Sequence, residues 1–159
     1  LFAPDFIWDG ADVLATSNSS GYRIDIVEGG HVTRSIRRAV DTVELDEVTA
    51  AREWGDTLRI TRLGCEIPPE EIVRGRGHAS TLPAIVDLTV DPEGQIWVRR
   101  DRLGPVDPID ILTTTGKYIG TLEGSFPFPA AVSASGTIFS LTEDSLGVPV
   151  VTAYRLVDG

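Results

Sequence analysis

The side chains best placed to bind an ion, orient a polar ligand or move a proton are His78, Arg100, Asp101, Glu143 and Asp144. His78 lies in a polar turn that leads into a predicted strand, and the other four lie in loops between two segments with the pattern of a β-strand. Glu143 and Asp144 are adjacent, so on an extended strand they point to opposite faces and cannot chelate one ion together. We therefore treat these five residues as ligand-binding candidates and assign no catalytic residue.

Thiol and imidazole groups are scarce in this sequence. It holds one cysteine, Cys65, and two histidines, His31 and His78. A catalytic thiol needs an imidazole brought beside it by the fold, and a closed zinc site needs four nitrogen or sulfur ligands. We expect Cys65 to be a buried packing residue.

Acidic residues are plentiful, so an oxygen-ligated calcium ion stays open as an alternative. The sequence has no EF-hand spacing, no Gly-x-Ser-x-Gly elbow and no His-Glu-x-x-His pair. We therefore predict no metal site and no cofactor, and keep calcium for the alternative function.

One segment recurs at a fixed spacing. Val90–Val98 returns as Val132–Ser140, with the glycine, isoleucine and aromatic positions of the two copies 42 residues apart. Ile109-Asp110-Ile111 has an earlier counterpart in Ile24-Asp25-Ile26, at about twice this offset. A period of about 40 to 45 residues is typical of the four-stranded propeller blade. The alternative is an ordinary antiparallel sandwich in which the spacing is coincidental.

Each copy alternates short strands with glycine turns. The second copy predicts strands at Ile85–Val90, Gln95–Arg99, Pro108–Thr113 and Lys117–Leu122. Two isoleucines flank Asp110, which is the alternation of a half-buried strand, and the bulk of Trp97 suits packing between blades. We predict that residues 83–122 form one four-stranded antiparallel blade.

The period changes between the first and second copies. The apolar residues of Glu44–Trp54 recur at helical spacing, at Leu45, Val48, Ala51 and Trp54. We expect Asp41 or Thr42 to cap this helix and Gly55 to end it. A second short acidic piece begins at Pro68-Pro69.

We predict a single partial propeller domain over residues 1–159. Its parts are a blade at 1–40, a helical insertion at 41–81, a blade at 82–124 and an incomplete last blade at 125–159. The alternative to the insertion is a degenerate blade that uses Thr57–Leu63 as a strand.

Composition excludes several classes of partner. The chain has 159 residues, 42% of them hydrophobic, and a formal net charge of -10. This charge repels phosphate backbones and anionic lipid surfaces, so we expect no nucleic-acid partner. No apolar run has the length of a membrane span, and no signal peptide is recognisable. Methionine is absent, so we expect the chain to be a piece of a longer product.

Three segments, Asp91–Arg100, Ile109–Ile111 and Gly116–Leu122, resemble the C-terminal blades of bacterial six-bladed β-propeller proteins, the NHL-type and gluconolactonase-like group. The ending Asp144–Leu156 is similar to the last blade of such proteins. This resemblance implies an all-β, partial propeller of about three blades, and it favours a secreted or periplasmic location. The metal-binding Glu, Asn and Asp of gluconolactonase-like enzymes have no matching motif here.

Propeller geometry explains the choice of candidates, because ligands meet the loops at one end of the central channel. Arg100–Asp107, Thr142–Gly147 and the turn at His78–Leu82 are such loops. Three blades make half of a six-bladed ring and leave apolar faces uncovered. We therefore predict a binding or assembly module that is completed by another copy of itself or by a missing propeller half, and that is not a lone monomer. The alternative is a calcium-assisted hydrolase of lactones or phosphoesters.

Overall fold

The computed structural model describes residues 6–8, 13–16, 21–55, 58–60, 64–101, 106–123 and 126–155. Its contacts divide these residues into two compact units. The smaller unit is Asp41–Leu82, and the larger one combines the described residues of Pro4–Val40 and Pro83–Gly159. Each unit has an apolar core of its own.

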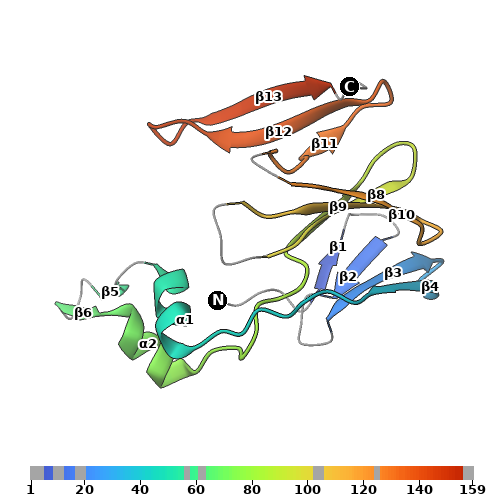
Figure 1. Cartoon of the computed structure of the whole chain (residues 1–159). Helices are drawn as coiled ribbons and strands as arrows, with labels where there is room; N and C mark the ends of the chain where they lie inside the picture. The colour runs from blue at the N-terminus through green and yellow to red at the C-terminus, as the bar shows by residue number, and fades with distance from the viewer. Residues whose placement is uncertain are drawn as a thin grey trace. The chain divides into compact units, whose positions relative to one another are not determined.

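The larger unit consists of three antiparallel sheets (Figure 1). The first contains β1 (Phe6–Trp8), β2 (Val13–Thr16), β3 (Tyr22–Glu28) and β4 (His31–Arg38), in that order. The middle sheet contains β7 (Asp87–Val90), β8 (Gln95–Arg99), β9 (Ile109–Thr113) and β10 (Tyr118–Leu122), again as neighbours in sequence order. The C-terminal sheet contains β11 (Ala131–Val132), β12 (Thr137–Glu143) and β13 (Pro149–Arg155). The predicted four-stranded antiparallel sheet over residues 83–122 is thereby confirmed.

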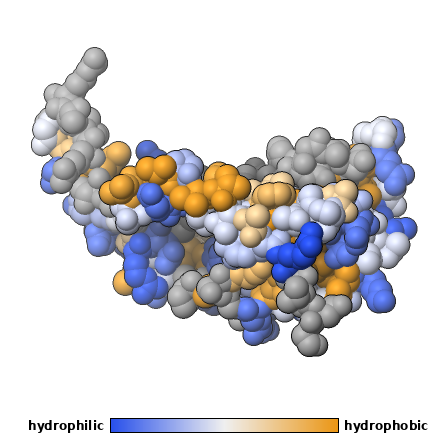
Figure 2. Space-filling model, turned by 90° about the horizontal axis from the view of Figure 1, so that it is seen from above, coloured by the Kyte–Doolittle hydropathy of each residue, from blue (hydrophilic) through white to orange (hydrophobic). Residues whose placement is uncertain are grey.

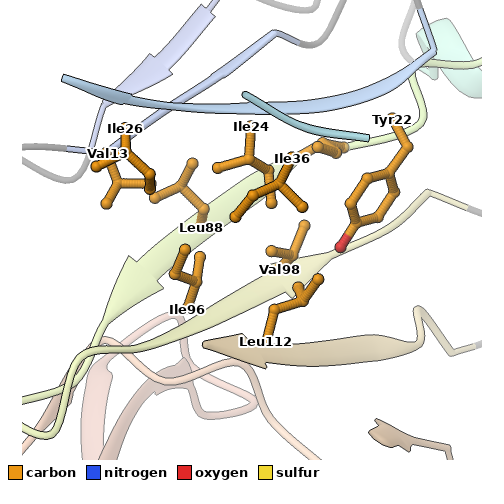
Figure 3. Packing of buried hydrophobic residues seen from close by; sticks show 10 residues of the cluster. Val13, Tyr22, Ile24, Ile26, Ile36, Leu88, Ile96, Val98 and Leu112 are labelled. Carbon is orange, nitrogen blue, oxygen red and sulfur yellow. The ribbon is translucent and has the colours of Figure 1, made fainter. Parts of the chain in front are cut away.

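The first and middle sheets pack face to face. Val13, Ile24 and Ile36 of the first sheet point toward Leu88 and Val98 of the middle sheet, and the whole group is buried (Figure 3). Full burial of one such aliphatic side chain contributes about 1.5 to 3 kcal/mol, so this core holds the two sheets together.

The opposite face of the middle sheet packs on the C-terminal sheet. Trp97, Ile109 and Ile111 form a second buried cluster with Ile138 of β12, and Tyr154 of β13 packs against it. Trp97 thus lies between two sheets, and its indole nitrogen donates to the Asp91 carboxylate at 3.1 Å.

The central strands of the middle sheet, β8 and β9, are buried on both faces, which corrects the expectation of a half-buried strand around Asp110. Ile109 and Ile111 face the C-terminal sheet, whereas Leu112 packs against the first sheet. Alternation places Asp110 on the same face as Leu112, where it is completely buried. The flanking isoleucines are therefore the mark of a central strand between two covering sheets.

One five-residue turn recurs between the strands. In Asp91–Gln95 and in Asp144–Val148, the N–H of the first residue donates to the carbonyl of the last, and the glycine N–H donates to the carbonyl of the first. Gly94 and Gly147 have φ angles of 79° and 74°, a region that other residues rarely adopt. Ser133–Thr137, 42 residues after Asp91–Gln95, has the same two backbone hydrogen bonds, so the sequence period marks a repeated turn as well as repeated strands.

The smaller unit contains two helices and a short hairpin. These are α1 (Glu47–Trp54), β5 (Leu58–Ile60), β6 (Cys65–Ile67) and α2 (Pro69–Arg76). Gly55 ends α1 and a proline begins α2, both as predicted. The Thr57–Leu63 segment does contain a strand, but its sheet has two strands and is flanked in sequence by helices.

Three expectations for this unit were wrong. The cap of α1 is Asp46, whose carboxylate accepts the Thr49 N–H at 2.7 Å, so the helix begins later than expected. Val48 lies on the solvent side with 78% of its surface exposed, because α1 turns Ala50 and Ala51 toward the core that contains Val73 of α2. Cys65 is also exposed, because the short hairpin that carries it has few covering residues.

Candidate functional site

The sequence-predicted candidates fall into both units. His78 belongs to the smaller unit, where its side chain is exposed. Arg100, Asp101, Glu143 and Asp144 belong to the larger unit. Asp101 is half-buried at the start of the connection from β8 to β9, of which residues 102–105 lie outside the described part.

Asp144 serves the turn between β12 and β13. Its Oδ1 accepts the backbone N–H groups of Leu146 at 2.8 Å and Val148 at 3.0 Å. Asp91 Oδ1 makes the same pair of bonds, to the second and fourth residues after it. The Asp144 carboxylate is therefore a turn acceptor, and the exposed Glu143 before it is the last residue of β12.

Arg100 leads to a buried site that the sequence did not reveal. Its Nε lies 3.0 Å from Oδ2 of Asp110, the carboxylate that is 0% exposed. Arg38, at the end of β4, donates to the same oxygen. The Thr121 hydroxyl donates to Oδ1 at 2.5 Å. We call Asp110, Arg38, Arg100, Thr121, Tyr118 and Tyr22 the Asp110 cluster.

Hydrogen positions in this cluster follow from its connectivity. The Thr121 hydroxyl gives its only proton to Asp110, so the Tyr118 hydroxyl, 2.5 Å away, must donate to Thr121. The Arg38 guanidinium stacks 4.2 Å from the centre of the Tyr118 ring. The strand-end residue Arg38 is thus fixed on two sides.

Burial and charge shift two pKa values here. Burial raises the pKa of the Tyr22 phenol, and the nearby Asp110 carboxylate raises it further. Partial burial opposes the charge of Arg38, yet its hydrogen bond and ion pair with Asp110 outweigh this, and the pKa of Arg38 is raised. Tyr22 therefore stays protonated, and Arg38 stays charged.

The Asp110 cluster is built to join two sheets. The Asp110 carboxylate is 0% exposed and each of its oxygens accepts a hydrogen bond from this chain, which favours a structural ion pair over proton transfer with a substrate. Asp25, its counterpart in the first sheet, accepts the Ser35 hydroxyl at 2.5 Å and pairs with Arg23. The signal in the sequence was an aspartate at the same position of two copies, Ile24-Asp25-Ile26 and Ile109-Asp110-Ile111.

The C-terminal sheet carries the main exposed apolar surface of the described larger unit. One face of its paired strands bears the register pairs Thr137–Arg155, Phe139–Ala153, Leu141–Val151 and Glu143–Pro149, with Ala131 of β11 beside Phe139. We call these nine residues the outer face. Leu141 and Val151, at its centre, are 61% and 68% exposed. Figure 2, which looks down on this sheet, shows apolar side chains gathered on the side seen there.

The same face of the middle sheet is covered. Register places Trp97 opposite Ile111 in the middle sheet, as Phe139 lies opposite Ala153 in the C-terminal sheet. Trp97 is 3% exposed because the C-terminal sheet packs over it. The outer face is therefore the counterpart of an internal sheet-to-sheet interface.

The described residues contain no group of three or more His, Cys, Asp or Glu side chains that could hold a metal ion. No described helix has the length and apolar character needed to cross a membrane. The chain matches no protein-family model, and no curated protein or solved structure matches it significantly.

Proposed function

We propose that this chain is an assembly module of blade-like β-sheets, of the kind that makes up a six-bladed β-propeller, and that its outer face binds another β-sheet. The observation that supports the proposal is the contrast between two equivalent positions. Ile109 in the middle sheet is 1% exposed, whereas Val151, its counterpart in the C-terminal sheet, is 68% exposed.

Energetics favour covering this face. Soluble proteins rarely expose a continuous apolar surface without a partner. Moving one aliphatic side chain from water into a packed interface contributes about 1.5 to 3 kcal/mol when burial is complete. Leu141 and Val151 are neighbours across two paired strands, so one opposing sheet can cover both.

The candidates for chemistry support binding over catalysis. Asp144 is engaged by its own turn, and Asp110 by two arginines and a hydroxyl. Nothing in the described residues supports the alternative of a calcium-assisted hydrolase, since they offer no cluster of carboxylate ligands.

A single lysine substitution tests whether the outer face is a docking surface. Val151→Lys should leave the urea midpoint nearly unchanged, because the side chain makes few contacts within the chain, and it should reduce ANS fluorescence, self-association or both. Val48→Lys is the matched control, because Val48 is 78% exposed on α1, outside the outer face, and its substitution should reduce neither.

Two results would contradict the proposal. If Val151→Lys unfolds the chain, the face is covered by the chain's own residues. If Val151→Lys alters neither ANS fluorescence nor self-association, the face is not a docking surface.

A further inference from the structure

The partner sheet can be named from the pattern of the outer face, an inference that rests on the proposed function. We infer that the outer face binds the outer face of a second copy of this chain, related to the first by a two-fold axis that reverses the strand direction. A two-fold interface uses the same patch on both copies, so it requires a self-complementary surface.

The outer face has charges only at its two ends. Arg155 lies at one end, beside Thr137, and Glu143 at the other, beside Pro149. When a second copy is laid on the face with its strands reversed, Arg155 of each copy lies at the same end as Glu143 of the other. A two-fold axis along the strands would instead put both Glu143 side chains at one end, where like charges repel.

The apolar centre also matches itself in this arrangement. Phe139 stands between two alanines, Ala131 and Ala153, and so forms a ridge with a low surface on either side. When the strands of the second copy run in the opposite direction, the row of Phe139 and the two alanines lies against the Leu141–Val151 row of that copy. A large aromatic ring thus meets medium-sized aliphatic side chains, a combination that packs well.

The outward face of the first sheet is a poor alternative partner for the outer face. The face of the first sheet that points away from the middle sheet bears Arg23 and Arg37, which lie opposite each other in register, together with Asp25 and Ser35. Docking the outer face there would cover charged groups with apolar ones, which is unfavourable. The described surfaces therefore favour face-to-face pairing over a head-to-tail chain of copies.

Net charge gives the inference a salt dependence. Each copy carries a net charge of -10, so two copies repel at long range, while the outer face itself carries one charge of each sign. Salt screens the long-range repulsion more than it weakens apolar contact. We expect the dimer to tighten as sodium chloride is raised from about 0.05 M to about 0.5 M.

The test is sedimentation equilibrium of the whole chain and of a charge-exchange series. Leu141→Lys should weaken dimerisation about 100-fold or more, since it places two lysines in the interface. Glu143→Arg and Arg155→Glu should each weaken it about 10-fold, and the double exchange should recover most of the loss. Val48→Lys, the control, should leave the dimer intact.

The outcomes separate this inference from the proposed function. If the chain is monomeric and Leu141→Lys abolishes ANS binding, the inference of a second copy is wrong, while the proposal that the outer face is a docking surface is retained. If the chain is monomeric and binds no ANS before or after substitution, both fail. If the chain dimerises but Leu141→Lys has no effect, or the double exchange gives no recovery, this pairing is overturned.

Discussion

Arg38 of β4 and Asp110 of β9, 72 residues apart in sequence, form an ion pair that ties the first sheet to the middle sheet. The carboxylate has no exposed surface, and the guanidinium is 31% exposed. A buried carboxylate is stable only when charged and hydrogen-bonded partners compensate for the lost water. Arg38 therefore holds the position of one sheet on the next.

Replacing Arg38 by methionine should destabilise the chain by about 1 to 3 kcal/mol, because Asp110 would keep Arg100 and Thr121 but lose its cross-sheet donor. Arg37→Met is the control, because Arg37 is exposed and lies on the other face of β4. Urea unfolding measures both. Equal effects of the two substitutions would show that the ion pair contributes nothing.

Tyr22 should make stability depend on pH in the alkaline range. Its pKa is raised above the usual value of 10.0, so above that pH the unfolded chain loses the phenolic proton while the folded chain keeps it. The free energy of unfolding should then fall as pH rises above 10. Tyr22→Phe should flatten this decline.

Tyr154→Phe is the matched control for the alkaline experiment, because it removes a different phenol and leaves Tyr22 in place. Urea unfolding at pH values from about 9 upward, in steps of roughly half a pH unit, gives the change in the free energy of unfolding with pH. A decline as steep in Tyr22→Phe as in the unmodified chain would refute the role of Tyr22.

The cap of α1 can be tested against the residue that the sequence favoured. Hydrogen bonds from Thr49 lower the pKa of the Asp46 carboxyl, so its contribution is present above the unfolded value of 3.8 and is lost as pH falls through the lowered folded value. Asp46→Ala should reduce the helical signal in circular dichroism at neutral pH. Asp41→Ala should not, and the reverse result would restore the earlier assignment.

The turns that begin at Asp91 and Asp144 share one hydrogen-bond pattern but should differ in their tolerance of substitution. Asp91 is 9% exposed and accepts three donors, including the indole of Trp97. Asp91→Ala should cost about 2 to 3 kcal/mol, because the buried indole N–H of Trp97 and two partly buried backbone N–H groups would lose their acceptor. Asp144→Ala removes the matching acceptor from an exposed turn and should cost less than about 1 kcal/mol. Similar costs at both positions would refute a role for burial.

Local patterns predicted the strands well. Gly94 and Gly116 mark the turns before Gln95–Arg99 and Tyr118–Leu122, and a glycine at a positive φ is a strong local signal. The same reasoning found Gly55 at the end of α1. These features depend on a few neighbouring residues, which a single sequence contains.

Features that depend on distant contacts were not predictable. The role of Asp110 requires Arg38 from another sheet, and nothing near either residue in sequence indicates the other. Val48 fits a helical apolar face by spacing, yet α1 packs its Ala50 and Ala51 side against Val73 of α2 and leaves Val48 in solvent. Arg100 and Asp144 were predicted as ligand-binding candidates from their charge and loop position, and only the structure shows which groups they contact.

The central claim is that the outer face of the C-terminal sheet binds another β-sheet, which in the isolated chain is a second copy. Multi-angle light scattering of the unmodified chain at micromolar concentration measures this most directly. We expect a folded species of about twice the 17.1 kDa chain mass, shifted to the single-chain mass by Val151→Lys. A well-folded species of 17.1 kDa in the unmodified chain, with no ANS binding, would contradict the claim.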